Sequence, residues 1–199
     1  MLKTLFLPGS TGSAALWRPV ADHAGLDGVF FAWPGLGAEP AQAGINSIDD
    51  LTRLVAAEIT EPVAIVAQSM GGVIAIQLAL QFPALVRSLV LAVTSGGVPV
   101  AELGGEDWRG DYFASYPFAA RWIAEPVADL SARIPSIRSP TLLLWGDADP
   151  VSPIAVGEKL RSLLPSARLR VFAGAGHDLA QSHYQAVAVE ITRHLRATS

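Results

Sequence analysis

The chain has 199 residues, a length that fits one domain of about 1–199 and that lets roughly 70% of the unfolded surface be buried. Apolar residues make up 51% and charged residues 16%, which excludes a disordered chain, and the net charge of -4 gives no electrostatic reason to expect nucleic acid or an anionic membrane as a partner. Cysteine is absent, which excludes disulfides, thiolate metal sites and a thiol nucleophile.

The first segment, MLKTLFLPGSTGS, breaks at Pro8-Gly9 and is too short for a secretory signal. No window holds 18 consecutive apolar residues, so we expect a cytoplasmic protein without a transmembrane helix. Six short apolar runs then predict buried strands, at residues 4–7, 29–33, 63–67, 88–93, 141–145 and 169–173.

Segments with helical spacing separate these runs, at about 14–24, 47–60, 70–82, 153–164 and 178–196. Ser47 and Asp50 are typical of a helix start, while Pro83 and Pro165 end two of the helices. Strands that alternate with helices predict an α/β fold: a doubly wound, mostly parallel six-stranded sheet with helices on both faces.

One segment interrupts the alternation. Between two strands lie residues 96–138, far more than the usual 2–6 connecting residues, and we interpret about 97–138 as a short helical insertion. It holds six of the 15 aromatic residues: Trp108, Tyr112, Phe113, Tyr116, Phe118 and Trp122. These aromatics either form the insertion's own core or also line an apolar substrate pocket, as parts of a lid.

Three chemically capable side chains follow predicted strands: Ser69, Asp149 and His177. Parallel sheets bind ligands beyond the carboxyl ends of their strands, which brings such residues together. Ser69 lies where a strand turns at once into a helix, and Ala67 and Gly71 supply the small residues that a tight turn needs. Taken alone, however, Ser69 could equally be a helix N-cap.

Asp149 alone could be a turn residue, and Asp147 competes for the same role. A lone loop histidine such as His177 is usually only solvent-exposed. Together the three residues are more informative, because a serine nucleophile needs a base near neutral pKa and that base needs a carboxylate to orient it. Their order and placement therefore predict a Ser-His-Asp catalytic set.

The sequence resembles the α/β-hydrolase family over nearly its whole length. The matching motifs, in chain order, are LFLPGSTGSAALW for the oxyanion loop, WPGLGAEP for the turn that follows it, AQSMGG for the nucleophile elbow, PTLLLWGDADPVSP for the acid segment and GAGHDL for the histidine loop. The resemblance implies that Ser69 is the nucleophile, His177 the general base and Asp149 the orienting acid. It also implies an oxyanion hole made by the backbone N–H groups of Met70 and Ser10.

Four departures from the family pattern stand out. Pro8 replaces the usual His-Gly of the oxyanion loop, Ala67 replaces the first glycine of the elbow, and Ala32 replaces an aspartate before the Pro-Gly-x-Gly turn. None of these removes a catalytic group. The chain also starts almost at the family's third strand, so we expect a minimal member that lacks the first two strands. Its first strand would then lie at or near a sheet edge, which a loop or a homodimer would cover.

The sequence therefore predicts a serine esterase that cleaves a small-molecule ester or related acyl bond without metal or cofactor. Gln68, beside the nucleophile, either contacts substrate or packs against the insertion. His23, His183 and His194 are interpreted as surface residues. Two alternatives stay open: a cofactor-free lyase or oxygenase that uses His177 and Asp149 while Ser69 only binds, and a non-catalytic small-molecule binding protein.

Overall fold

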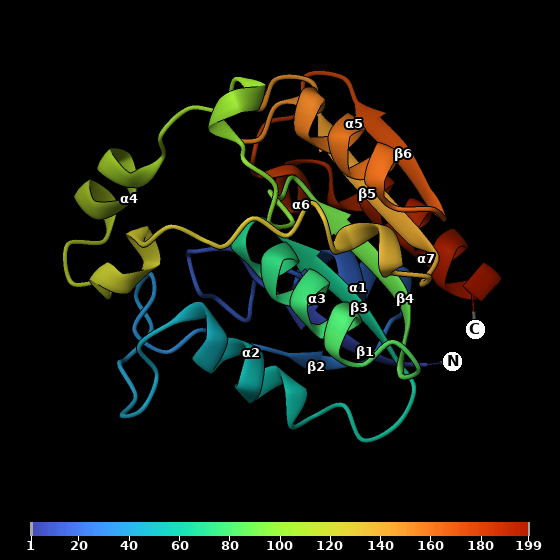
Figure 1. Ribbon diagram of the computed structural model, residues 1–199, viewed down its shortest axis with the longest axis horizontal. Helices are drawn as coiled ribbons and strands as arrows, with labels where there is room; N and C mark the ends of the chain where they lie inside the picture. The colour runs from blue at the N-terminus through green and yellow to red at the C-terminus, as the bar shows by residue number, and fades with distance from the viewer. Residues whose placement is uncertain (1, 199) are drawn as a thin grey trace.

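The structure is a computed structural model that describes residues 2–198. Its six strands form one parallel sheet in the order β2-β1-β3-β4-β5-β6 (Figure 1). They are β1 (Lys3–Leu7), β2 (Val29–Phe30), β3 (Val63–Gln68), β4 (Val86–Ala92), β5 (Thr141–Gly146) and β6 (Ala167–Phe172). The predicted parallel, six-stranded α/β architecture is therefore confirmed.

Strand β2 is shorter than the predicted segment 29–33. Phe31 still donates its N–H to the carbonyl of Phe6 in β1, but the N–H of Trp33 bonds instead to the carbonyl of Gly12, in the loop after β1. The chain leaves the sheet here because the Pro34-Gly35 turn follows, with Gly35 at φ 80°. This turn lies beside the loop that follows β1.

Helices cover both faces of the sheet. They are α1 (Arg18–Ala24), α2 (Ile48–Ala56), α3 (Met70–Gln81), α5 (Ile154–Leu163), α6 (Leu179–Ser182) and α7 (Tyr184–Thr198). In Figure 1, α3 and α5 lie in front of the strands and α1 behind them. At the start of α2, Ser47 Oγ accepts a hydrogen bond from the N–H of Asp50 at 3.1 Å, which confirms the predicted cap.

The predicted final helix at 178–196 is two helices. Helix α6 ends at Ser182, the backbone of His183 (φ -122°, ψ 27°) is not helical, and α7 begins at Tyr184. The interpretation of His194 as a surface residue was wrong. Helix α7 packs against β4 and buries His194 to 6% exposure, and Ser88 Oγ lies 3.0 Å from its Nε2. A buried hydroxyl on the strand thus supplies the polar partner that burial of the imidazole requires.

The insertion between β4 and β5 consists of loops and short helices: η1 (Ala101–Leu103), α4 (Arg109–Ser115), η2 (Arg121–Ala124) and η3 (Ile134–Ser136). Figure 1 shows its α4 end projecting beyond the sheet, above the loop that follows β2. The two segments are joined where Ala120 donates its N–H to the carbonyl of Gly35 at 2.8 Å. The insertion is therefore attached to the side of the molecule where the strands end.

The sheet edges are β2 and β6, and β1 lies one strand in from an edge. A homodimer that covers the short β2 edge stays a prediction. Among residues 2–198, no helix is both long enough and apolar enough to cross a bilayer.

Candidate active site

Ser69 occupies a strained turn between β3 and α3. Its backbone lies at φ 53° and ψ -125°, a region that costs a non-glycine residue about 1–3 kcal/mol. The turn is packed tightly, because a Cβ on Gly71 would lie 2.5 Å from the carbonyl oxygen of Pro8. Ser69 makes no capping hydrogen bond through its side chain, so the interpretation as a plain helix N-cap was wrong. The hydroxyl is free to point away from the helix.

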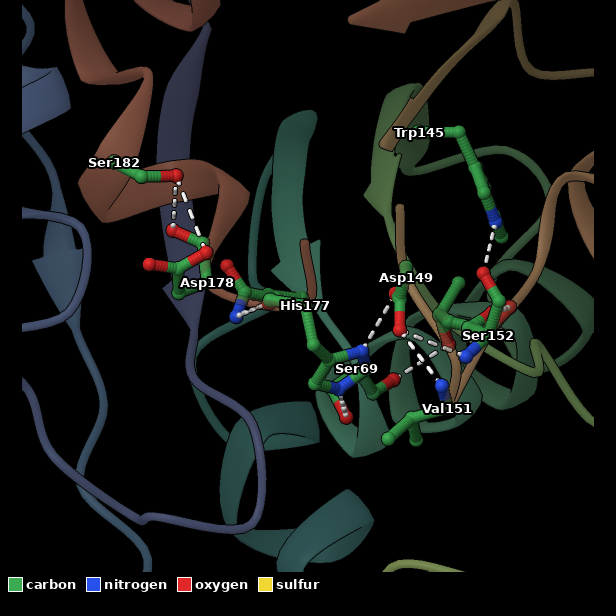
Figure 2. A network of polar contacts seen from close by, with 10 residues as sticks. Ser69, Trp145, Asp149, Val151, Ser152, His177, Asp178 and Ser182 are labelled. Carbon is green, nitrogen blue, oxygen red and sulfur yellow. Dashed lines mark hydrogen bonds and ion pairs between the residues drawn. The ribbon is translucent and has the colours of Figure 1, made fainter. Parts of the chain in front are cut away.

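The hydroxyl points instead to the predicted histidine. Ser69 Oγ lies 2.9 Å from His177 Nε2, and His177 Nδ1 lies 2.8 Å from Asp149 Oδ2 (Figure 2). An ionised carboxylate only accepts hydrogen bonds, so Nδ1–H donates to Asp149 and the lone pair of Nε2 is left to accept from the serine. The three side chains come from the ends of β3, β5 and β6 and form one continuous relay.

Asp149 is held by more than the histidine. Its side chain is fully buried, and its Oδ1 accepts the backbone N–H groups of Val151 at 2.9 Å and Ser152 at 3.0 Å. These bonds stabilise the buried charge and fix the direction of Oδ2. The competing Asp147 has a different role, because its Oδ1 accepts the N–H of Gly174 at 2.6 Å and so holds the loop before His177.

The predicted oxyanion donors, Ser10 and Met70, lie near Ser69. Ser10 and Met70 border the same cavity as Ser69, and Met70 is the first residue of α3, where a helix presents free N–H groups. The loop after β1 approaches so closely that a Cβ on Gly9 would lie 3.1 Å from the Cβ of Ser69. Trp33 fixes this loop by donating its indole N–H to the carbonyl of Pro8 at 2.9 Å.

A side chain from the insertion also holds this loop. The Tyr112 hydroxyl donates to the carbonyl of Ser10 at 2.8 Å and accepts the N–H of Gly37 at 2.9 Å. Burial raises the pKa of Tyr112, so the phenol keeps its proton and remains a donor across the physiological pH range. The insertion and the predicted oxyanion loop are therefore coupled through one buried residue.

Two cavities meet at Ser69 and His177, and Ser10, Ser69 and His177 border both. The insertion-side cavity, of about 580 Å³, is bordered mainly by apolar side chains, among them Met70, Val73, Val93, Val98, Ile123 and Val127. The loop-side cavity, of about 480 Å³, is bordered by the loop after β1, by Glu39 and Gln68, and by His177, Asp178 and Gln181. Both cavities thus open onto the Ser69 hydroxyl.

The predicted pocket residues are only partly brought to these cavities. Trp108 borders the insertion-side cavity, and Gln68 and Tyr116 border the loop-side cavity. The prediction for Phe118 was wrong, because its side chain is 99% exposed. Tyr112, Phe113 and Trp122 line neither cavity and pack against the apolar core. Within residues 2–198, these three side chains thus join the core cluster that also contains the sheet residues, rather than a separate core of the insertion.

Two residues that the sequence analysis did not single out lie beside the Ser69 turn. Thr94, two residues after the end of β4, donates its hydroxyl to the carbonyl of Ser69. Val93 has φ 41°, the other non-glycine residue with positive φ within 2–198, and borders the insertion-side cavity. Thr94 carried a signal, because it is a polar residue at the end of a buried strand. The positive φ of Val93 could not be predicted, because valine is not a residue type that favours this conformation.

Among residues 2–198, no three His, Asp or Glu side chains are grouped so that they could hold a metal ion. That catalysis needs no metal or cofactor stays a prediction of the sequence analysis.

The chain matches the model of the α/β hydrolase family over residues 4–190. With the fold and the strand-end positions of Ser69, Asp149 and His177 described above, this match is decisive: the chain belongs to the α/β hydrolase family.

Among curated relatives, the polyketide synthase ThaQ of Burkholderia thailandensis is 31% identical over 79% of this chain, which spans only about a tenth of that protein's length. A pimeloyl-[acyl-carrier protein] methyl ester esterase from Chromobacterium violaceum is 28% identical over 81% of each protein. The enzyme of the same name from Nitrosomonas europaea is 25% identical over 72% of this chain and 75% of its own.

Solved structures share the fold. A thermophilic esterase from Thermogutta terrifontis superposes with a TM-score of 0.78 at 21% identity, covering 100% of this chain and 90% of that one. The α/β hydrolase MGS-MChE2, from a sediment metagenome of the Mar Chica lagoon, gives a TM-score of 0.75 at 22% identity over 98% and 91% of the two chains.

Proposed function

We propose that this α/β hydrolase is a serine hydrolase that cleaves a carboxylic ester or a related acyl bond through an acyl-enzyme intermediate. The observation that carries the proposal is the relay in which Ser69 Oγ lies 2.9 Å from His177 Nε2 and His177 Nδ1 lies 2.8 Å from Asp149. Methyl ester esterases among the curated relatives support an ester as the bond that is cleaved.

In the first half-reaction, Ser69 Oγ attacks the substrate carbonyl carbon while His177 Nε2 takes the hydroxyl proton. The carbonyl oxygen becomes an oxyanion that accepts hydrogen bonds from the N–H groups of Met70 and Ser10. When this intermediate collapses, the bond to the leaving group breaks and His177 gives the proton to the departing alcohol. The acyl group is then bonded to Ser69.

In the second half-reaction, His177 accepts a proton from a water molecule as the water attacks the acyl carbon. The new oxyanion occupies the same site, and its collapse returns the proton to Ser69 Oγ and releases the carboxylic acid. Asp149 stabilises the imidazolium during both halves. The protein's own residues supply every group that these steps need. A cytoplasmic location and a small-molecule substrate remain expectations from the sequence.

The test is hydrolysis of p-nitrophenyl esters of increasing acyl length by the wild type and by Ser69→Ala and His177→Ala. We expect saturable hydrolysis by the wild type and a loss of at least about 10³-fold in kcat for both variants. Activity that survives Ser69→Ala would favour the lyase or oxygenase alternative. A folded wild type that binds esters without turnover would favour the binding-protein alternative.

A further inference from the structure

The histidine loop GAGHDL is attached to the end of β5 a few residues before His177. Asp147 Oδ1 accepts the N–H of Gly174 at 2.6 Å, and Gly174 itself has φ 73°. Between this attachment and the histidine lies Gly176, which has no side chain to restrict its backbone. The direction in which the imidazole leaves the loop therefore needs a further constraint.

Gln68, the last residue of β3 and the neighbour of Ser69 in the chain, supplies that constraint. Its Nε2 donates to the backbone carbonyl of His177 at 3.1 Å. Because a carbonyl only accepts hydrogen bonds, it turns the N–H₂ end of the amide toward itself and Oε1 away. Within residues 2–198, Gln68 is the one hydrogen-bond partner of the His177 backbone. The bond thus joins the strand that carries the nucleophile to the loop that carries the base.

The contacts of Gln68 do not fit a role in binding substrate. The residue is 5% exposed, although it borders the loop-side cavity. Its Oε1 is buried, and its Nε2 is already bonded to the carbonyl of His177. One polar atom of the amide is thus shielded and the other is occupied. Of the two roles that the sequence analysis left open for Gln68, contact with substrate loses its support.

The amide also lowers the stability of the fold at this position. Within residues 2–198, Gln68 Oε1 accepts no hydrogen bond from the protein, and burial of an unpaired acceptor is unfavourable. A methionine side chain has a similar length and brings no such acceptor. It cannot, however, donate an N–H to His177. Stability alone thus favours an apolar residue here, and the donor is the property that distinguishes glutamine.

We propose that Gln68 is a positioning residue for the base: its bond to the His177 carbonyl keeps the imidazole 2.9 Å from Ser69 Oγ and 2.8 Å from Asp149 Oδ2. Asp149 orients the ring itself, whereas Gln68 fixes the backbone from which the ring projects. Such placement matters, because a displacement of about 1 Å at a reacting group can lower the rate about 100-fold. This inference rests on the proposed function and adds a residue to its machinery.

The test compares two substitutions at Gln68. In Gln68→Met the donor is lost at similar length, and in Gln68→His the ring Nε2 lies as many bonds from the backbone as the glutamine Nε2. With a p-nitrophenyl ester, we expect Gln68→Met to lower kcat about 10- to 100-fold and to change KM less than about twofold. Its urea midpoint should equal or exceed that of the wild type. Gln68→His should recover most of the lost kcat.

The matched control is Gln42→Met, at an exposed position that borders neither cavity, which should keep the wild-type kcat. A wild-type kcat in Gln68→Met would overturn the inference. A fall in kcat that comes with a loss of stability, and that Gln68→His does not reverse, would also overturn it, because Gln68 would then act by packing alone.

A second readout does not depend on turnover. The proton on His177 Nδ1, bonded to Asp149, should exchange with water more slowly in the wild type than in Gln68→Met when followed by NMR. Equal exchange rates would contradict the positioning role. Failure of the proposed function is distinguished from this result, because then no ester would be cleaved in a reaction abolished by Ser69→Ala, while the exchange rates would still report on the position of His177.

Discussion

At the scale of single residues, the site depends on close packing around Ser69, where a larger side chain on a neighbouring glycine would not fit. Ser69 keeps a backbone conformation that side-chain-bearing residues rarely adopt, and four neighbouring features hold it there: the bond from Thr94, the bond of its own N–H to Ala92, and the absent side chains of Gly71 and Gly72. The strain is thus compensated by packing and hydrogen bonds around the turn. Its consequence is a hydroxyl that faces His177 rather than the helix.

Gly71→Ala tests this packing. The added methyl group would lie 2.5 Å from the carbonyl oxygen of Pro8 and 2.9 Å from that of Leu7, so the end of β1 or the elbow must move. We expect the free energy of unfolding, measured by urea denaturation, to fall by about 1–3 kcal/mol, with a loss of esterase activity. Gly110→Ala is the control, because a Cβ there meets no atom within 4 Å. Equal stability of the two variants would contradict the packing account.

Asp149→Asn tests the choice between the two acids. The amide Oδ1 can still accept from Val151 and Ser152, but the other end would present an N–H₂ group to His177 Nδ1 and favour the wrong tautomer. We expect kcat to fall by about 10⁴-fold while the fold is retained. Asp147→Asn should change kcat far less, since the Asp147 carboxylate accepts the N–H of Gly174 rather than a bond from His177. A larger fall in kcat for Asp147→Asn than for Asp149→Asn would mean that Asp149 is not the orienting acid.

At the scale of elements, the insertion and the oxyanion loop are joined by Tyr112 of α4. Its hydroxyl bonds to Ser10 and Gly37, which lie on two different loops, so the position of the insertion is linked to the position of a predicted oxyanion donor. That the insertion acts as a lid stays a prediction, and the effect of this contact on activity can be measured.

Tyr112→Phe removes that contact and leaves the ring. We expect kcat to fall by about tenfold and KM to change little, because the bond orients Ser10 rather than holding substrate. Steady-state kinetics and urea denaturation should be measured together, with Tyr184→Phe on α7 as the control. If Tyr112→Phe has a normal kcat, or lowers only the free energy of unfolding, Tyr112 has a structural role alone.

Helix α7 packs its His194 against Ser88 of β4, and this contact predicts a pH dependence of stability. Burial and, next, the charge of Arg168 lower the pKa of His194. The unfolded chain therefore binds a proton that the folded chain does not, and the free energy of unfolding should fall as pH drops below about 6.5, by at most about 1.4 kcal/mol per pH unit from this group.

The check is urea denaturation at pH 7.5, 6.5 and 5.5 for the wild type and for His194→Gln, which can still hydrogen-bond but cannot titrate. We expect a shallower dependence on pH in the variant. His23→Gln, at an exposed position on α1, should keep the wild-type slope. Identical slopes in all three proteins would mean that His194 does not contribute.

For the molecule as a whole, the sheet and the grouping of Ser69, His177 and Asp149 were predictable from the sequence, because buried parallel strands are continuous apolar runs and the residues that follow their carboxyl ends meet at one edge of the sheet. The details that depend on neighbours distant in sequence were not predictable. His194 has polar sequence neighbours, and only the packing of α7 on β4 buries it. Likewise, nothing in the residue types separates Phe118, which is exposed, from Tyr112, which is buried.

The central claim is that Ser69 is a nucleophile activated by His177 and Asp149, and the most direct measurement is labelling with a fluorophosphonate followed by intact-mass analysis of the wild type and Ser69→Ala. The account predicts one adduct on the wild type, located at Ser69, and none on the variant. A folded wild-type protein that takes up no label, or a variant labelled equally well, would contradict it.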